Sequence, residues 1–173
     1  MATELWGPAL YGDPCRECGF GWQITPDEAI EIVAGFPGDF SRLLKGTDGS
    51  QRHTDLSWSA SAYVCHVADN LRIWAERLAG ARLSGVLEVP GYDQDLLGQA
   101  RHYNEVALGA ALWSLTSAVD LWRDSVQAAL ASHVVLNHAS RGRMTTADVA
   151  RANAHDGSHH VWDVSRIVDA ASR

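Results

Sequence analysis

The chain has 173 residues, with 14 basic and 21 acidic side chains and a formal net charge of −7. This length is enough for one domain to bury a hydrophobic core without disulfides, so we expect a single domain over 1–173, with an irregular N-terminal segment over 1–24. No run of Lys or Arg forms the basic stripe that phosphate backbones require, which argues against a nucleic-acid partner. No stretch has the length and apolarity of a membrane helix. We therefore expect a cytoplasmic protein with no membrane partner.

The first helix is predicted over 25–44. Thr25 is placed as its N-cap, Pro26 at the first helical position, and Glu28 completes a capping box. Apolar residues then recur at spacings of three and four, as one face of an amphipathic helix requires.

Three more helices are predicted from the same periodicity, and the first of them has a serine at its start and a glycine at its stop. They run from Ser57 or Ser59 to Gly80, from about Tyr103 to Ala131, and from Thr145 or Thr146 to about Ala170. A short extended piece with a turn at Arg141–Gly142 separates the last two. Four such helices predict an all-α four-helix bundle, and the connection over 82–101 is long enough to cross it.

The stretch "NAHDGSHHVWD" in the last helix holds three histidines. Successive helical residues are rotated by about 100°, so His155 and His159 lie one turn apart, within about 40° of each other, and can converge on one metal ion. His160 is rotated by about 140° from His155 and is expected outside this pair, as a surface or supporting residue paired with Asp156.

A third ligand has to come from another helix, because catalytic metals usually keep three protein ligands and open positions. His66 in "YVCHVADN" is the best candidate. It lies beside the apolar seam of Val64 and Val67 and can therefore point into the bundle.

The segments "AYVCHVADNLRIWAERL" and "DVARANAHDGSHHVWDV", with the long middle crossover, resemble the DinB/YfiT-like superfamily of metal-binding four-helix bundles. The resemblance covers about 25–170. It implies an up-down-down-up bundle and a divalent metal, often nickel or zinc, held by one histidine of the second helix and an H-x-x-x-H pair of the fourth. By motif these ligands are His66, His155 and His159.

The resemblance also implies an activity. Relatives include a maleylpyruvate isomerase that uses mycothiol, with a glutamate where this chain has His155, and S-transferases that use mycothiol or bacillithiol. Three neutral imidazoles would leave the metal's +2 charge uncompensated and favour an anionic thiolate. We therefore expect an enzyme in which a small-molecule thiol attacks an electrophilic substrate. A stress or detoxification protein that binds metal or ligand without turnover, and hydrolysis by metal-bound hydroxide, are the alternatives.

Other residues are assigned around this centre. Tyr63, Asn70 and Trp162 are the candidates for shaping the substrate pocket, and Asp69 and Asp163 for orienting imidazoles. A homodimer is left open, with tryptophans such as Trp6 or Trp22 as candidates for its surface.

Cys15 and Cys18 form a C-x-x-C motif followed by glycine, which resembles half of a zinc knuckle. A structural zinc would need two more ligands. In the topology that the resemblance implies, His133 or His138 lies at the same end of the bundle and could supply one. Two reduced, partly buried thiols are the alternative, and Cys65 is expected in the core.

Overall fold

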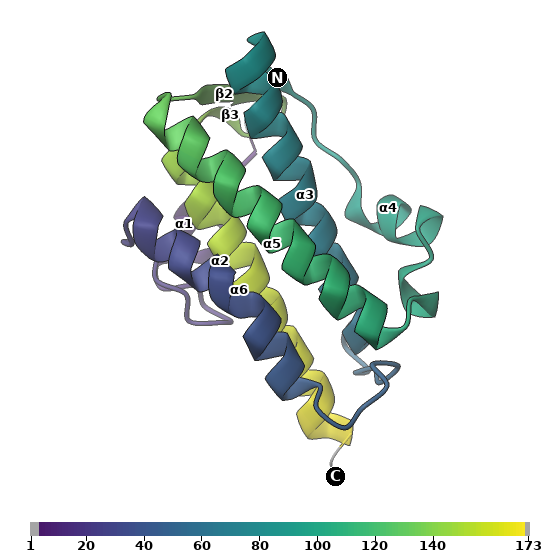
Figure 1. The fold of residues 1–173 in the computed structure, drawn as a ribbon. Helices are drawn as coiled ribbons and strands as arrows, with labels where there is room; N and C mark the ends of the chain where they lie inside the picture. Colours follow the sequence, from purple (N-terminus) through teal and green to yellow (C-terminus); the bar gives the residue numbers. More distant parts are fainter. Residues whose placement is uncertain (1–3, 172–173) are drawn as a thin grey trace.

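Four long helices form the body of the protein (Figure 1), and the computed structural model describes residues 4–171. These helices are α2 (Pro26–Leu43), α3 (Ala60–Ser84), α5 (Leu108–Ala131) and α6 (Thr146–Ala171). The shorter elements are α1 (Pro8–Tyr11), β1 (Glu88–Val89), α4 (Gln94–Ala100), the 3-10 helix η1 (Tyr103–Glu105), β2 (Val135–His138) and β3 (Gly142–Thr145). The predicted four-helix bundle is confirmed.

The bundle has the expected up-down-down-up order (Figure 1). Strand β1, which follows α3, pairs in parallel with β2, which follows α5. At the opposite end, the Ser61 hydroxyl donates to the carbonyl oxygen of Val106, just before α5, at 2.8 Å. The two middle helices therefore run in the same direction. Arg151 near the start of α6 donates to the carbonyl oxygen of Ile24, just before α2, at 2.7 Å, so the outer helices also start at one end.

The predicted N-caps of the first two long helices are confirmed. The Thr25 hydroxyl accepts the amide of Glu28, whose carboxylate accepts the amide of Thr25 at 2.7 Å. Ser59 caps α3 by accepting a backbone amide. Helix α3 does not stop at the predicted Gly80 but continues until Gly85, whose left-handed backbone (φ 67°) ends it.

The predicted start of the third helix at Tyr103 is wrong. His102 has a left-handed backbone (φ 52°), and the next three residues form only η1. The Tyr103 side chain is buried, and its hydroxyl donates to the carboxylate of Asp69 at 2.6 Å. This buried hydrogen bond pulls the crossover against α3, so that α5 begins only at Leu108.

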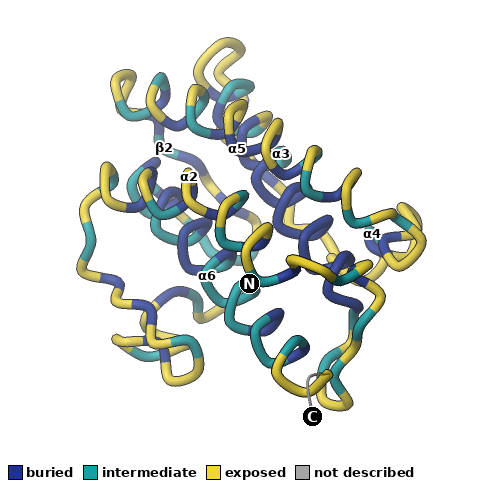
Figure 2. Tube along the Cα trace, turned by 60° about the horizontal axis from the view of Figure 1, so that its bottom comes forward, coloured by how far each residue is buried: buried dark blue, intermediate teal, exposed yellow. Residues whose placement is uncertain are grey.

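The first half of α3 is buried on every side, in contrast to the alternating exposure of the other helices (Figure 2). All residues over 59–71 are buried, because α5, α6 and the crossover elements α4 and η1 all pack against α3. His66 therefore lies in the interior, with 1% of its surface exposed. Within residues 4–171, none of the helices combines the length and apolar character that crossing a membrane requires.

The N-terminal segment over 4–24 lies against α6. Trp22 is buried, contrary to its candidacy for a dimer surface. Asp13 fixes the fold of the segment, since its carboxylate accepts the backbone amide of Trp22 and the side-chain amide of Gln23, both at 3.0 Å. This segment thus forms an outer wall for α6.

Gly157 lets α2 approach α6 closely. A Cβ at this position would lie 2.0 Å from Cε2 of Phe36, an α2 residue that is 1% exposed. Phe36 has no free space to move into, because it belongs to the close-packed core. The glycine between the ligand positions of α6 is therefore required by packing.

Gly157→Ala is expected to lower the free energy of unfolding by about 1–3 kcal/mol in urea denaturation, because the methyl group overpacks the core. Gly80→Ala is the matched control: Gly80 is also helical, and nothing lies near the position of its added Cβ. The control should gain about 0.5–1 kcal/mol from helix propensity. Equal stability of the two variants would show that Phe36 does not restrict Gly157.

Candidate metal centre

Helix α6 carries two interleaved pairs of side chains that can bind metal. His155 and His159 form one i, i+4 pair, and Asp156 and His160 form the other. Because the second pair is rotated by about 100° from the first, the two pairs face different neighbours. Each pair meets further ligands from another part of the chain.

The first group consists of His66 from α3 with Asp156 and His160 from α6. One ligand atom from each residue lies within 4.8 Å of the others. His66 Nε2 is 3.6 Å from Asp156 Oδ2, and His160 Nε2 is 3.8 Å from Asp156 Oδ1. The two imidazole rings are perpendicular, with centroids 4.8 Å apart. Three possible ligands thus converge between α3 and α6.

The hydrogen bonding of the two imidazoles fits a bound cation. Both ring nitrogens of His66 are buried and have no hydrogen-bond partner within residues 4–171. Such atoms are rare, because an unpaired buried polar group costs about 1–3 kcal/mol. His160 Nδ1 lies 3.0 Å from Asp163 Oδ2, which leaves Nε2 directed toward Asp156. A carboxylate behind a histidine is the usual second partner of a metal-binding imidazole. The residues therefore fit a divalent cation.

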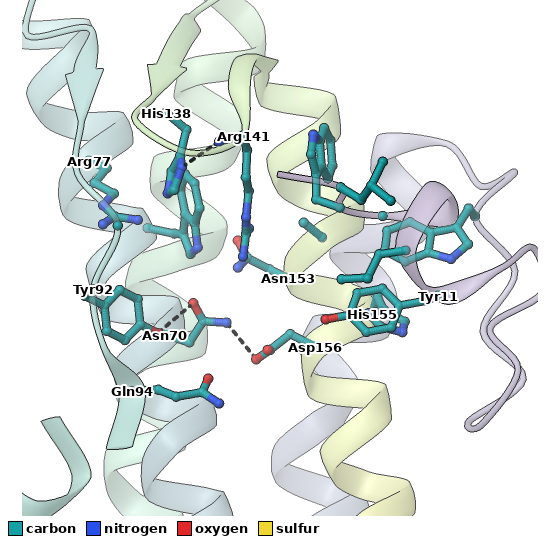
Figure 3. A pocket seen from close by; sticks show the side chains of 18 residues that line it. Tyr11, Asn70, Arg77, Tyr92, Gln94, His138, Arg141, Asn153, His155 and Asp156 are labelled. Carbon is teal, nitrogen blue, oxygen red and sulfur yellow. Dashed lines mark hydrogen bonds between the residues drawn. The ribbon is translucent and has the colours of Figure 1, made fainter. Parts of the chain in front are cut away.

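Asp156 is held in its ionised form beside the two imidazoles. Burial acts to raise its pKa, but nearby His66 and His160 and the hydrogen bond from Asn70 hold the pKa well below its usual range. Asn70 Nδ2 donates to Asp156 Oδ2 at 2.6 Å, and Asn70 Oδ1 accepts from the Tyr92 hydroxyl at 3.3 Å (Figure 3). Burial raises the pKa of Tyr92, so its phenol stays protonated and can donate.

A cavity of about 170 Å³ opens beside Asp156 (Figure 3). Arg77 and Arg141 line it, together with Asn70 and Tyr92. The Arg77 guanidinium lies 4.7 Å above the ring of Trp74, another lining residue, and donates to a backbone carbonyl oxygen. Two guanidinium groups and several hydrogen-bonding side chains make this cavity suitable for a small anionic molecule.

The second group on α6 brings His155 and His159 together with Cys15 and Cys18. One ligand atom from each of the four residues lies within 4.8 Å of the others. The rings of the two histidines are 5.6 Å apart, in agreement with the predicted convergence. Burial and the charge of nearby His159 lower the pKa of His155 to about 4, so its imidazole is neutral at pH 7.

The structure does not bring the predicted ligand trio of His66, His155 and His159 into one group. His66 does not share a group with His155 or His159; it meets Asp156 and His160 instead. Tertiary packing explains this grouping, because α3 packs on the side of α6 that carries Asp156 and His160. The N-terminal segment covers the first pair. His160, expected outside the centre, is the histidine that lies beside His66.

The remaining predicted pocket residues lie at different places. Asn70 lines the cavity. The ring of Tyr63 packs on His160, with centroids 5.1 Å apart, and does not line this cavity. The ring of Trp162 packs on that of His159, with centroids 5.4 Å apart. Trp162 therefore lies on the face of α6 that carries His155 and His159.

The two aspartates predicted to orient imidazoles also differ. Asp163 does contact an imidazole, that of His160. Asp69 does not, because its carboxylate accepts from Tyr103 and Arg101 and pairs with Arg72. Its role is to fasten the crossover to α3.

The structure also does not bring the expected partners of the cysteines beside them. His138 lines the cavity, and neither His133 nor His138 joins the cysteine group. The spacing C-x2-C with H-x3-H, common in structural zinc sites, could have indicated the observed partners His155 and His159. The 137-residue separation of Cys18 and His155 obscured it. Cys65 is buried, as predicted, and belongs to neither group.

Comparisons with known proteins support the fold alone. No protein-family model matches the chain, and no curated protein matches its sequence. Among solved structures, the chain is similar to YfiT from Bacillus subtilis, described as a probable metal-dependent hydrolase with an unusual four-helix bundle topology. The TM-score is 0.74 at 14% sequence identity, covering 85% of this chain and 87% of that chain. The chain thus has a YfiT-like fold.

His160→Ala is expected to weaken Zn²⁺ binding at the first group by more than 100-fold, because one of three ligands is lost. Asp163→Asn should weaken it by roughly 10–100-fold, since only the partner behind His160 changes. Equilibrium dialysis over a range of free Zn²⁺ measures both effects. His53→Ala, outside both groups, is the control. A binding curve of His160→Ala that matches this control would contradict the assignment.

Proposed function

We propose that this protein is a divalent-metal-dependent enzyme of the DinB/YfiT type whose catalytic ion is held by His66, Asp156 and His160. The observation that carries the proposal is the convergence of two imidazoles and one carboxylate beside an arginine-lined cavity. Two histidines and a carboxylate are also the catalytic zinc ligands of thermolysin and carboxypeptidase A. The fold of YfiT, itself described as a probable metal-dependent hydrolase, supports the same class. Zinc and nickel are the candidate ions.

The side chains around the group have separate tasks in this proposal. A bound ion would supply Lewis acidity that lowers the pKa of a coordinated water or thiol. Asn70 restrains Asp156 through its 2.6 Å hydrogen bond, and Asp163 restrains His160 through its 3.0 Å contact. These restraints fix the ligand atoms before substrate arrives, so little reorganisation is needed during the reaction.

The cavity indicates the substrate class. Its volume of about 170 Å³ is well below the roughly 300–1,000 Å³ of pockets for drug-sized ligands, so the substrate is small. Arg77 and Arg141 can bind a carboxylate or phosphate group of this substrate, while Asp156 lies at the other side of the same cavity (Figure 3). We propose hydrolysis of a small anionic substrate as the first reaction to test.

A thiol-dependent transfer or isomerisation is the second candidate, and Asp156 favours it. The mycothiol-dependent isomerase of the DinB/YfiT-like superfamily has a glutamate in its ligand pair, and here a carboxylate is paired with His160 one turn later. In this version a mycothiol-like small-molecule thiol is the co-substrate, and an electrophile occupies the cavity. The carboxylate leaves a net charge of about +1 on the centre, which still favours a thiolate.

The test is turnover by the zinc- or nickel-loaded protein with a carboxylated nitrophenyl ester, and with monobromobimane plus mycothiol. Ester cleavage without thiol would support hydrolysis, and formation of the mycothiol–bimane conjugate at a rate above that of the protein-free reaction would support the second candidate. His66→Ala should abolish either activity, while His53→Ala should retain it. Failure of both reactions across several thiols and anionic esters would contradict the catalytic proposal and favour metal or ligand binding without turnover.

Arg141→Gln is expected to raise KM for an anionic substrate by roughly 10–100-fold with little change in kcat, because a charge-assisted hydrogen bond contributes about 1.5–3 kcal/mol. A neutral ester of the same size should show no such change. Steady-state kinetics with the matched pair of substrates measures the difference. Equal KM effects on both esters would show that Arg141 does not bind the anionic group.

A further inference from the structure

A second set of possible metal ligands lies outside the proposed catalytic group. Cys15 and Cys18 come from the N-terminal segment, and His155 and His159 from α6. We propose that these four residues form a structural Cys2His2 zinc site that fastens the N-terminal segment to α6. This proposal does not depend on the chemistry at His66, Asp156 and His160.

The spacing of the ligand atoms suits a tetrahedral ion. All four ligand atoms lie within 4.8 Å of one another. Zinc bonds of about 2.0–2.3 Å in a tetrahedron place ligand atoms about 3.3–3.8 Å apart. Any pair therefore needs to move by no more than about 1.5 Å, which side-chain rotation can supply.

The two histidines have nitrogen atoms available for the ion. His155 Nε2 and His159 Nδ1 are buried and have no hydrogen-bond partner within the described part of the chain. The other nitrogen of His159, Nε2, lies 3.3 Å from the Glu17 carboxylate. Glu17 stands between the two cysteines in sequence, so the loop that offers the sulfurs also offers the carboxylate behind an imidazole. This is the usual arrangement around metal-binding histidines.

The backbone of the loop brings the two cysteines to one side. The amide of Gly19 donates to the carbonyl oxygen of Cys15 at 3.0 Å, and the amide of Cys15 donates to the carbonyl oxygen of Phe20 at 2.8 Å. Gly19 has a left-handed backbone (φ 76°), which glycine adopts at little cost. The tight turn that results resembles a zinc knuckle, in which two thiolates share one ion.

Charge and surroundings indicate a structural ion. Two thiolates neutralise the +2 charge of zinc, so four protein ligands close the site without water. Aromatic rings enclose His155: the centroids of Tyr11 and Trp22 lie 4.5 Å from its ring, and that of Phe20 lies 5.4 Å away. Of the four proposed ligands, His155 lines the cavity beside Asp156, and neither cysteine does.

The proposed zinc site would also position one wall of the cavity beside Asp156. Leu10 and Tyr11 of the N-terminal segment line the cavity, and so do Trp6 and Trp22. The segment itself has only the short helix α1 between residue 4 and the start of α2. Its internal hydrogen bonds, such as those from Trp22 and Gln23 to Asp13, fold the segment upon itself, and a cross-link to α6 would hold the folded segment against the helix.

Cobalt substitution tests the proposal directly. Co²⁺ bound by two thiolates and two imidazoles gives strong thiolate-to-metal charge-transfer absorption and intense visible bands, whereas a His2Asp centre has no sulfur. Titration of the reduced, metal-free protein should produce these bands, and they should reach full intensity by two equivalents of Co²⁺, when both groups are filled. The double variant Cys15→Ser, Cys18→Ser should abolish the charge-transfer band, Cys15→Ser alone should weaken it, and Cys65→Ala should retain it. Persistence of the band in the double cysteine variant, or its absence from the wild-type protein, would overturn the proposal.

The number of zinc ions bound per protein distinguishes the proposed structural site from the proposed catalytic site. The wild-type protein should bind two equivalents of zinc, and His66→Ala and Cys15→Ser should each lose a different one. Cys18→His, which keeps a zinc ligand, should retain the second equivalent and resist protease cleavage near residues 15–18 better than Cys15→Ser. Zinc content unchanged by Cys15→Ser, or equal cleavage of the two cysteine variants with and without zinc, would contradict a structural zinc site.

Discussion

The rotation of the α-helix by about 100° per residue is the constraint on which the arrangement of α6 depends. It places His155 and His159 on one face and Asp156 and His160 on the next, within six consecutive residues. Each pair then meets a different neighbour: α3 supplies His66, and the N-terminal segment supplies two cysteines. A single turn and a half of helix can therefore serve two groups of different chemistry, one with a carboxylate beside a cavity and one with two sulfurs.

The two groups are mechanically connected through their shared helix. Gly157 lies inside the ligand stretch and allows Phe36 of α2 to pack directly against it, which fixes the position of α6. On the other side, Asp69 fastens the crossover to α3 through Tyr103, so that His66 remains buried. The N-terminal segment supplies the two cysteines of one group, and other side chains of the same segment line the cavity beside the other group. A change in the position of this segment would therefore affect both groups.

The sequence predicted the four helices of the bundle because they depend on local signals, whereas the up-down-down-up order was an implication of the resemblance. The capping box of Thr25 and the apolar periodicity of the four helices are examples of such local signals. The convergence of His155 and His159 was also predictable, since it follows from helical geometry. Their partners were not, because the side of α6 that α3 covers is decided by tertiary packing. Helical geometry and the resemblance both directed the assignment to the H-x-x-x-H pair, whereas the structure places Asp156 and His160 beside His66.

Anomalous X-ray diffraction from crystals of the zinc-loaded protein at the zinc absorption edge is the most direct test of the account. Two separate peaks are expected, one among His66, Asp156 and His160 and the other among the two cysteines with His155 and His159. A single peak shared by His66, His155 and His159 would contradict the division of α6 into two ligand faces. The absence of any peak within either group would contradict metal binding itself.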